Sequence, residues 1–147
     1  MMDISENVLH DLTKRTVDVG DVFLVELDSN DGIRPKDGAA TRHKYFVVLG
    51  FDSEDNAYGG VIINSHINQR MDQVVKDYHM PIKSTKYSFL RYDSFVDCLT
   101  LKTAPVAKLV TSKYSGHIDD DDIKLIMGAL KESPREKIAR LKRFGII

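Results

Sequence analysis

The chain has 147 residues, 42% of them hydrophobic and 29% charged, so it is long and apolar enough to bury the core of one domain. Its net charge of -1 excludes a globally basic nucleic-acid binder but leaves room for a local basic patch. The single cysteine, Cys98, excludes an internal disulfide and a multi-cysteine zinc site, which favours a reducing cytoplasm. No apolar run is long enough to cross a membrane, and residues 1–15 lack a signal-peptide core.

The first half of the chain predicts a helix, a long loop and a β-hairpin. The helix follows from apolar residues at helical spacing behind a capping box formed by Asp3 and Glu6. The strands follow from runs of β-formers between turn residues, and the loop is long enough to suggest a function. In chain order we expect a helix at Asp3–Thr13, a strand at Val22–Leu27, a loop at Asp28–His43, and hairpin strands at Lys44–Gly50 and Tyr58–Asn64.

Short strands continue through the middle of the chain. Ser65–Asp77 is polar and fits either a loop or a short helical turn. Runs of β-formers then predict three strands, at Tyr78–Ile82, Ser94–Leu101 and Pro105–Val110. Strands this numerous and short, between polar turns, favour a small closed or half-closed β-barrel.

Two helices are predicted at the C-terminal end. Asp119–Asp122 supplies an acidic N-terminus for a helix whose apolar stripe is Ile123, Ile126, Met127 and Leu130. Ser133–Glu136 has the form of a second cap and capping box, with Ile138 and Leu141 expected to face inward. Lys131–Arg143 contains six basic and two acidic residues, a pattern typical of a solvated helix face that could also extend an RNA path or dock an acidic tail. The predicted fold class is mainly β (α+β), a small β-barrel with an N-terminal helix and C-terminal helices.

Several short motifs occur in a characteristic order: Gly20-Asp21, Val47-Val48-Leu49, Ser65 after the next strand, Arg91-Tyr92-Asp93, and Gly116 before the helix Ile123–Leu130. Their order and spacing resemble the MazF/PemK/Kid family of bacterial growth-inhibiting toxins. The resemblance covers about Val17–Leu130 and implies an SH3-like barrel at 17–130 within a single domain, 1–147. Residues 1–16 and 131–147 would then be helical extensions, and we expect the barrel to fold without residues from Ser133 onward.

The resemblance also implies a function. Family members are metal-independent endoribonucleases that cleave single-stranded RNA, act as homodimers in the cytoplasm, need no cofactor, and are blocked by an antitoxin protein. Asp93 is then the candidate base for a ribose 2′-hydroxyl, a role that calls for a raised pKa. Arg91 stands where the Kid branch would place an acid, although a guanidinium is better suited to stabilising phosphate charge. Arg42 and Lys44 would hold the flanking phosphate, and Ser65 would donate a hydrogen bond to it.

Departures from the family pattern keep other functions open. The Arg-Pro pair before the Val-Val-Leu strand is Arg42-His43 here, and the loop-histidine position is Ile33, for which His43 could substitute. One alternative is a non-catalytic barrel that binds nucleic acid or a protein, and another is a structural barrel whose helices serve assembly. Asp93-Ser94 could equally be a turn or cap, and Arg91 could simply pair with Asp93 on the surface.

Other chemistry-bearing residues have simpler interpretations. The histidines lack metal-ligand spacing, so no metal site is predicted, and Cys98 is expected to pack in the core. Three tyrosines near basic segments could stack on bases or be ordinary strand residues: Tyr45, Tyr87 and Tyr92.

Overall fold

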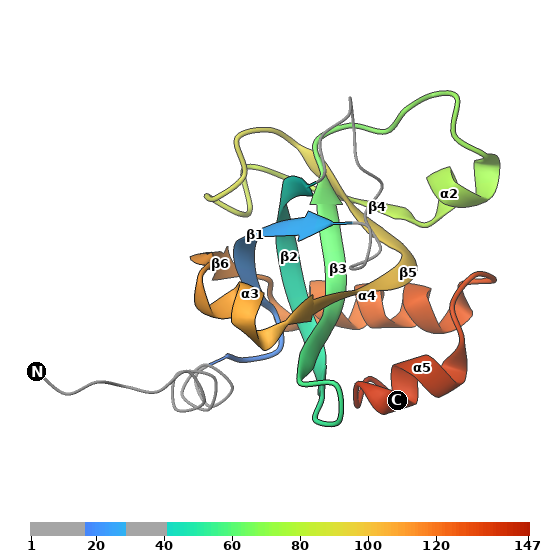
Figure 1. Cartoon of the computed structure of the whole chain (residues 1–147). Coiled ribbons are helices and arrows are strands. Elements are labelled where there is room, and N and C mark those ends of the chain that lie inside the picture. The colour runs from blue at the N-terminus through green and yellow to red at the C-terminus, as the bar shows by residue number, and fades with distance from the viewer. Residues whose placement is uncertain (1–16, 29–40) are drawn as a thin grey trace, which may run out of the picture.

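In the part of the chain that the structure describes, six antiparallel strands form one open sheet with helices packed on it (Figure 1). The computed structural model describes residues 17–28 and 41–147. The strand order is β4-β5-β3-β2-β1-β6. The strands are β1 (Asp21–Asp28), β2 (Thr41–Asp52), β3 (Ala57–Asn64), β4 (His79–Ile82), β5 (Ser94–Pro105) and β6 (Lys113–His117). The helices are α2 (Gln73–Asp77), α3 (Val106–Val110), α4 (Asp120–Glu132) and α5 (Ile138–Arg143).

A mainly β fold with several helices is confirmed, but the sheet is not closed. β4 and β6 are its two edges, and no pairing joins them within residues 17–28 and 41–147. The predicted helix Asp3–Thr13 and most of the predicted loop Asp28–His43 lie outside the described residues. The last part of that loop was wrongly predicted, because β2 begins at Thr41, where its backbone already pairs with the end of β1.

The predicted β2–β3 hairpin is confirmed and forms the middle of the sheet. Side chains alternate along its strands, so each strand contributes to both sides of the sheet. One side, packed under α4 and α5, includes Val47, Leu49, Val61 and Ile63. The other side packs against α3 and includes Phe46, Val48 and Ile62. The core therefore has two layers that share one sheet.

The last predicted strand is a helix instead. β5 runs without a break from Ser94 to Pro105, and α3 follows, so Pro105–Val110 does not form a separate strand. Proline fixes its own φ near the helical value. Its missing N–H costs nothing at the start of a helix, where backbone N–H groups have no partner within the helix. Val106 and Leu109, three residues apart, are the side chains that α3 buries. The prediction missed β6, an edge strand of mostly exposed polar residues without apolar alternation.

Helix α4 forms as its sequence pattern predicts. The side chain of Asp119 accepts a hydrogen bond from the backbone N–H of Asp122 (2.9 Å), which caps the helix. The stripe of Ile123, Ile126 and Leu130 is buried against the sheet. Burial of each such side chain contributes about 2 kcal/mol to stability.

The chain after α4 differs from the predicted second cap. Ser133 ends α4 rather than starting a helix, and α5 begins only at Ile138. The Ser133 hydroxyl donates to the Leu99 carbonyl of β5 and accepts from the Arg135 N–H (3.2 Å), but the chain after it forms a turn, and the next helix begins only at Ile138. Leu141 is fully buried as predicted, but Ile138 is 47% exposed and does not face inward.

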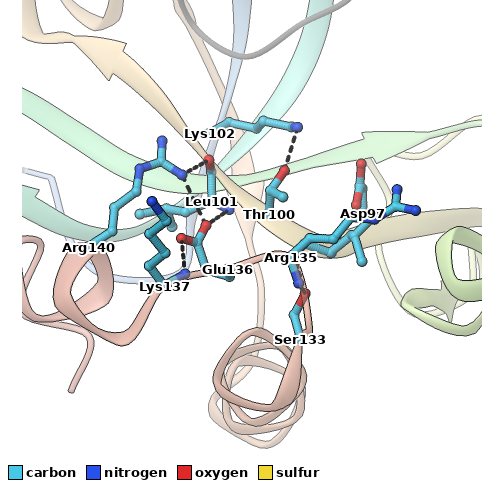
Figure 2. A network of polar contacts seen from close by, with 10 residues as sticks. Asp97, Thr100, Leu101, Lys102, Ser133, Arg135, Glu136, Lys137 and Arg140 are labelled. Carbon is cyan, nitrogen blue, oxygen red and sulfur yellow. Dashed lines mark hydrogen bonds and ion pairs between the residues drawn. The ribbon is translucent and has the colours of Figure 1, made fainter.

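Side chains from the segment after α4 bind backbone groups of β5 that have no partner on a neighbouring strand (Figure 2). Between the pairs Gly60↔Lys102 and Ile62↔Asp97 the register of β3 and β5 shifts, which leaves Leu101 without a strand partner there. Glu136 accepts from the Leu101 N–H (2.5 Å), and Arg140 donates to the Leu101 carbonyl (2.8 Å). Arg140 also pairs with Glu136 (3.0 Å), whose side chain is only 2% exposed. This charged pair therefore takes the place of a neighbouring strand.

The end of the chain holds β2 in a similar way. The Phe144 carbonyl accepts from the Phe51 N–H (3.0 Å), next to Gly50. A Cβ at Gly50 would lie 2.0 Å from that carbonyl oxygen, so only glycine permits the approach. Arg143 donates to Asp52 (2.6 Å) and to Asp55. Leu141, Phe144 and Ile146 belong to the main core cluster, although the family resemblance implies that residues 131–147 are an extension of the barrel.

Candidate nucleic-acid interface

Strand register brings the predicted site residues to one end of the sheet. β1 and β2 pair there through Val25↔Lys44 and Glu26↔His43. The last pair of β3 with β5 is Asn64↔Phe95, so the chain beyond β3 and the chain before β5 meet at the same end. Figure 1 shows the arrowhead of β3 at the top of the sheet, where β5 begins. We call this region the candidate sheet end, defined as Arg42–Lys44, Asn64–Ser65 and Arg91–Ser94.

A chain of hydrogen bonds fixes the side chain of Lys44 at this end. Its ammonium donates to Asn64 Oδ1 (2.8 Å), and Asn64 Nδ2 lies 3.2 Å from Nε2 of the buried His79. His79 Nδ1 lies 2.6 Å from the Val75 carbonyl of α2. A carbonyl only accepts, so the imidazole carries its proton on Nδ1 and accepts from Asn64 at Nε2. No local pattern predicts this link, since Asn64 and His79 lie on strands that are not adjacent in the sheet.

Asp93 is held by the loop that precedes β5. Its Oδ1 accepts from the Ser84 backbone N–H (2.9 Å) and from the Ser84 hydroxyl (3.0 Å), and Lys83 lies 3.7 Å from Oδ2. The backbone and hydroxyl hydrogen bonds of Ser84, followed by Lys83, lower the pKa of Asp93 below its ordinary value. A base for a ribose 2′-hydroxyl calls for a raised pKa, and the surroundings of Asp93 shift its pKa in the opposite direction. Asp93 is therefore ionised at neutral pH and is a weak base.

Arg91 and Tyr92 are exposed beside Asp93. The predicted surface pair between Arg91 and Asp93 does not form, because Asp93 is bonded to Ser84 and Lys83. Within residues 17–28 and 41–147 the Arg91 guanidinium makes no hydrogen bond or ion pair. A fully charged group at this position is free to bind a phosphate.

His43 and Arg42 extend the site along β2. His43 Nε2 lies 4.0 Å from a carboxylate oxygen of Glu26, and both side chains are more than half exposed. They line a shallow hollow of about 310 Å³ together with Leu24, Asp28, Lys108, Thr111 and Ser112. The backbone of Arg42 pairs with Leu27, and its side chain lies outside the described part of the chain.

Ser65 is exposed directly after β3. Its Oγ lies 3.3 Å from His66 Nδ1. No third side chain is bonded to His66 within the described residues, so this contact does not form a nucleophilic triad. The hydroxyl is exposed, and its hydrogen bond to a phosphate oxygen stays a prediction.

Two further expectations concern Cys98 and metal binding. Cys98 is fully buried in the core, as predicted, and burial raises the pKa of its thiol to about 12, so it is an inert packing residue. In the part of the chain that the structure describes, no group of three His, Cys, Asp or Glu side chains could hold a metal ion. None of the described helices has the length and apolar character needed to span a membrane.

Comparison of the chain with models of known protein families and with curated proteins finds no match.

Proposed function

We propose that this chain binds single-stranded RNA across the candidate sheet end and cleaves it without a metal ion. The observation that carries the proposal is the strand register, which gathers residues from three separate segments at one end of the sheet. Lys44, Ser65 and Arg91 supply phosphate-binding groups there, while Asp93 supplies the only acidic side chain of the candidate sheet end. This arrangement supports recognition of a sugar-phosphate backbone rather than of a metal or an organic cofactor.

Each predicted site residue has its own role in the proposed cleavage reaction. Asp93 accepts the proton of the ribose 2′-hydroxyl, and the 2′-oxygen then attacks the adjacent phosphorus. The bond from phosphorus to the 5′-oxygen breaks, and that oxygen takes a proton from water, which leaves a 2′,3′-cyclic phosphate. Arg91 stabilises the negative charge that develops on the phosphate, while Lys44 and Arg42 bind the flanking phosphate. Ser65 and His43 contribute hydrogen bonds to the RNA backbone.

The same proposal covers partners and fold. The open, six-stranded sheet is taken as a variant of the SH3-like barrel, and the chain as the toxin of a toxin–antitoxin pair in the cytoplasm. A homodimer would place two candidate sheet ends in one assembly, and an antitoxin would block RNA by occupying them. Support for these points comes from the ordered motifs between Gly20 and Leu130.

The test is incubation of purified protein with a long single-stranded RNA in EDTA, beside Asp93→Asn. We expect fragments with 2′,3′-cyclic phosphate ends from the parent protein and none from Asp93→Asn. Asp121→Asn, which removes an exposed carboxylate at the start of α4, is the matched control and should cleave normally. Equal cleavage by Asp93→Asn would remove Asp93 from the reaction.

A second candidate is RNA binding without cleavage, and the geometry of Asp93 favours it. One carboxylate oxygen already accepts two hydrogen bonds from Ser84, and the lowered pKa makes proton transfer from a hydroxyl less favourable. This function predicts intact RNA in the cleavage assay together with an affinity that falls as salt rises, because phosphate contacts release counterions. A structural barrel whose helices serve assembly, the third alternative, predicts no salt-dependent affinity for RNA.

A further inference from the structure

Of the three tyrosines near basic segments, the structure leaves one available for binding. Tyr45 packs edge-on against Phe89 (5.1 Å between ring centroids), and its hydroxyl donates to the Phe89 carbonyl. Tyr87 is buried, and its hydroxyl donates to Asp122. Tyr92 is 64% exposed, which is unusual for so large an aromatic side chain.

The backbone that carries Tyr92 is held in place on both sides. The Ser94 hydroxyl donates to the Tyr92 carbonyl (2.8 Å). Asp93, the residue after Tyr92, accepts hydrogen bonds from the backbone N–H and the hydroxyl of Ser84. Leu90, just before this stretch, is buried in the main core cluster. The ring is therefore presented from a fixed backbone, so a ligand would have little chain entropy to remove.

The charges around Tyr92 indicate the ligand. Arg91 precedes it with an unpaired guanidinium among the described residues, and the Lys83 ammonium lies 3.7 Å from a carboxylate oxygen of Asp93, the next residue. An exposed aromatic face beside cations matches the way proteins bind single-stranded nucleic acid, in which bases stack on rings and cations hold phosphates. A duplex would hide its base faces, so the match is to a single strand.

We propose that Tyr92 is a base-stacking residue for single-stranded RNA, with Arg91 binding the adjacent phosphate. The proposal rests on RNA binding at the candidate sheet end, and it does not require cleavage. It assigns base contact to a residue that the proposed reaction does not use, and it predicts affinity without a strict sequence requirement, because every base has a stacking face.

The test measures binding by fluorescence anisotropy with two labelled probes of equal length. One is a single-stranded 2′-O-methyl oligonucleotide, which lacks the attacking hydroxyl and stays intact, and the other is its abasic counterpart with the same phosphates. We expect Tyr92→Ala to weaken binding of the base-containing probe about tenfold or more, the usual loss of one stacked base. Tyr92→Phe keeps the ring and should bind like the parent. On the abasic probe, Tyr92→Ala and the parent should bind equally.

Controls separate this proposal from the proposed function. Tyr114→Ala removes a tyrosine of similar exposure (56%) from β6 and should leave binding unchanged, because its ring already packs against Phe23 (5.6 Å between ring centroids). Arg91→Ala should weaken binding of both probes and should make the affinity less dependent on salt concentration. If the parent and Arg91→Ala behave as expected but Tyr92→Ala binds like the parent, the stacking role is wrong and RNA binding stands. An equal loss on both probes would also overturn stacking, and a parent protein that binds neither probe would overturn RNA binding itself.

Discussion

The C-terminal segment 133–147 and the candidate sheet end are both basic in sequence, yet the structure uses their charges differently. In the C-terminal segment Arg140 and Arg143 are bonded to the body of the protein, through the Leu101 carbonyl and through Asp52 and Asp55. At the candidate sheet end Arg91 has no such partner among the described residues, and Asp93 and Tyr92 are exposed. A run of positive charge can therefore hold a fold together or meet a ligand, and only its partners distinguish the two.

The largest expected effect comes from removing the C-terminal segment. Deletion of residues 133–147 takes away three buried apolar side chains, each contributing about 2 kcal/mol, and leaves backbone groups of β5 without partners. Together these losses approach the total stability of an ordinary domain, about 5–15 kcal/mol. Unlike the expectation from sequence alone, we expect no cooperative thermal unfolding by circular dichroism. A cooperative transition close to that of the full chain would show that the charges of the C-terminal segment are no more important for stability than those of the candidate sheet end.

Within α5, one matched pair of substitutions sharpens the comparison. Leu141→Ala should destabilise the protein by about 2–5 kcal/mol, because the buried leucine leaves a cavity. Ile138→Ala, at an exposed position of the same helix, should change stability by less than about 0.5 kcal/mol. Urea unfolding measures both free energies. Similar values for the two variants would show that α5 is not anchored by Leu141.

Glu136 tests whether hydrogen bonding contributes beyond packing. Glu136→Ala removes the acceptor for the Leu101 N–H and the partner of Arg140, with an expected loss of about 2–3 kcal/mol in urea unfolding. Glu136→Gln retains an acceptor and should lose less. Asp93→Asn at the exposed candidate sheet end should shift the unfolding midpoint less than Glu136→Ala does, because the amide oxygen of asparagine can still accept from Ser84. A larger shift than that of Glu136→Ala would contradict the comparison.

Tyr58 provides a buried polar group of the opposite kind. Its hydroxyl is buried and has no hydrogen-bond partner among residues 17–28 and 41–147, and burial raises the pKa of Tyr58 to about 12. The hydroxyl loses its hydration on folding and gains no hydrogen bond in return. Tyr58→Phe removes this hydroxyl, so the free energy of unfolding should rise by about 1 kcal/mol. Thermal unfolding of the variant provides the measurement, and a loss of stability would mean that the hydroxyl has a partner in solution.

The smallest expected effect is on the pH dependence of RNA cleavage. Because Ser84 and Lys83 lower the pKa of Asp93, the carboxylate stays ionised as the pH falls from 7 to 5, and its proton-accepting form is lost only below its ordinary pKa. The cleavage rate should therefore stay level over this window. A histidine base of ordinary pKa, about 6.5, would make the rate fall about tenfold per pH unit below that value. Such a fall would show that a histidine, and not Asp93, is the base.

Local sequence patterns were sufficient for much of the fold. Runs of β-formers predicted β1, β2, β3, β4 and the greater part of β5, and helical spacing behind an acidic cap predicted α4, because these preferences act between residues close in the chain. The open sheet, the helix α3 and the edge strand β6 could not be obtained in this way, since burial and strand pairing decided them.

For the candidate site, the sequence determined which residue types are present, and the tertiary structure decided their states. The exposure of Arg91 and Ser65 and the proximity of Lys44 to the start of β5 depend on strand register. The lowered pKa of Asp93 depends on Ser84, and the position of Lys44 on Asn64 and His79, through hydrogen bonds between separate segments. Such contacts are absent from any local pattern because they form only when distant parts of the chain pack together.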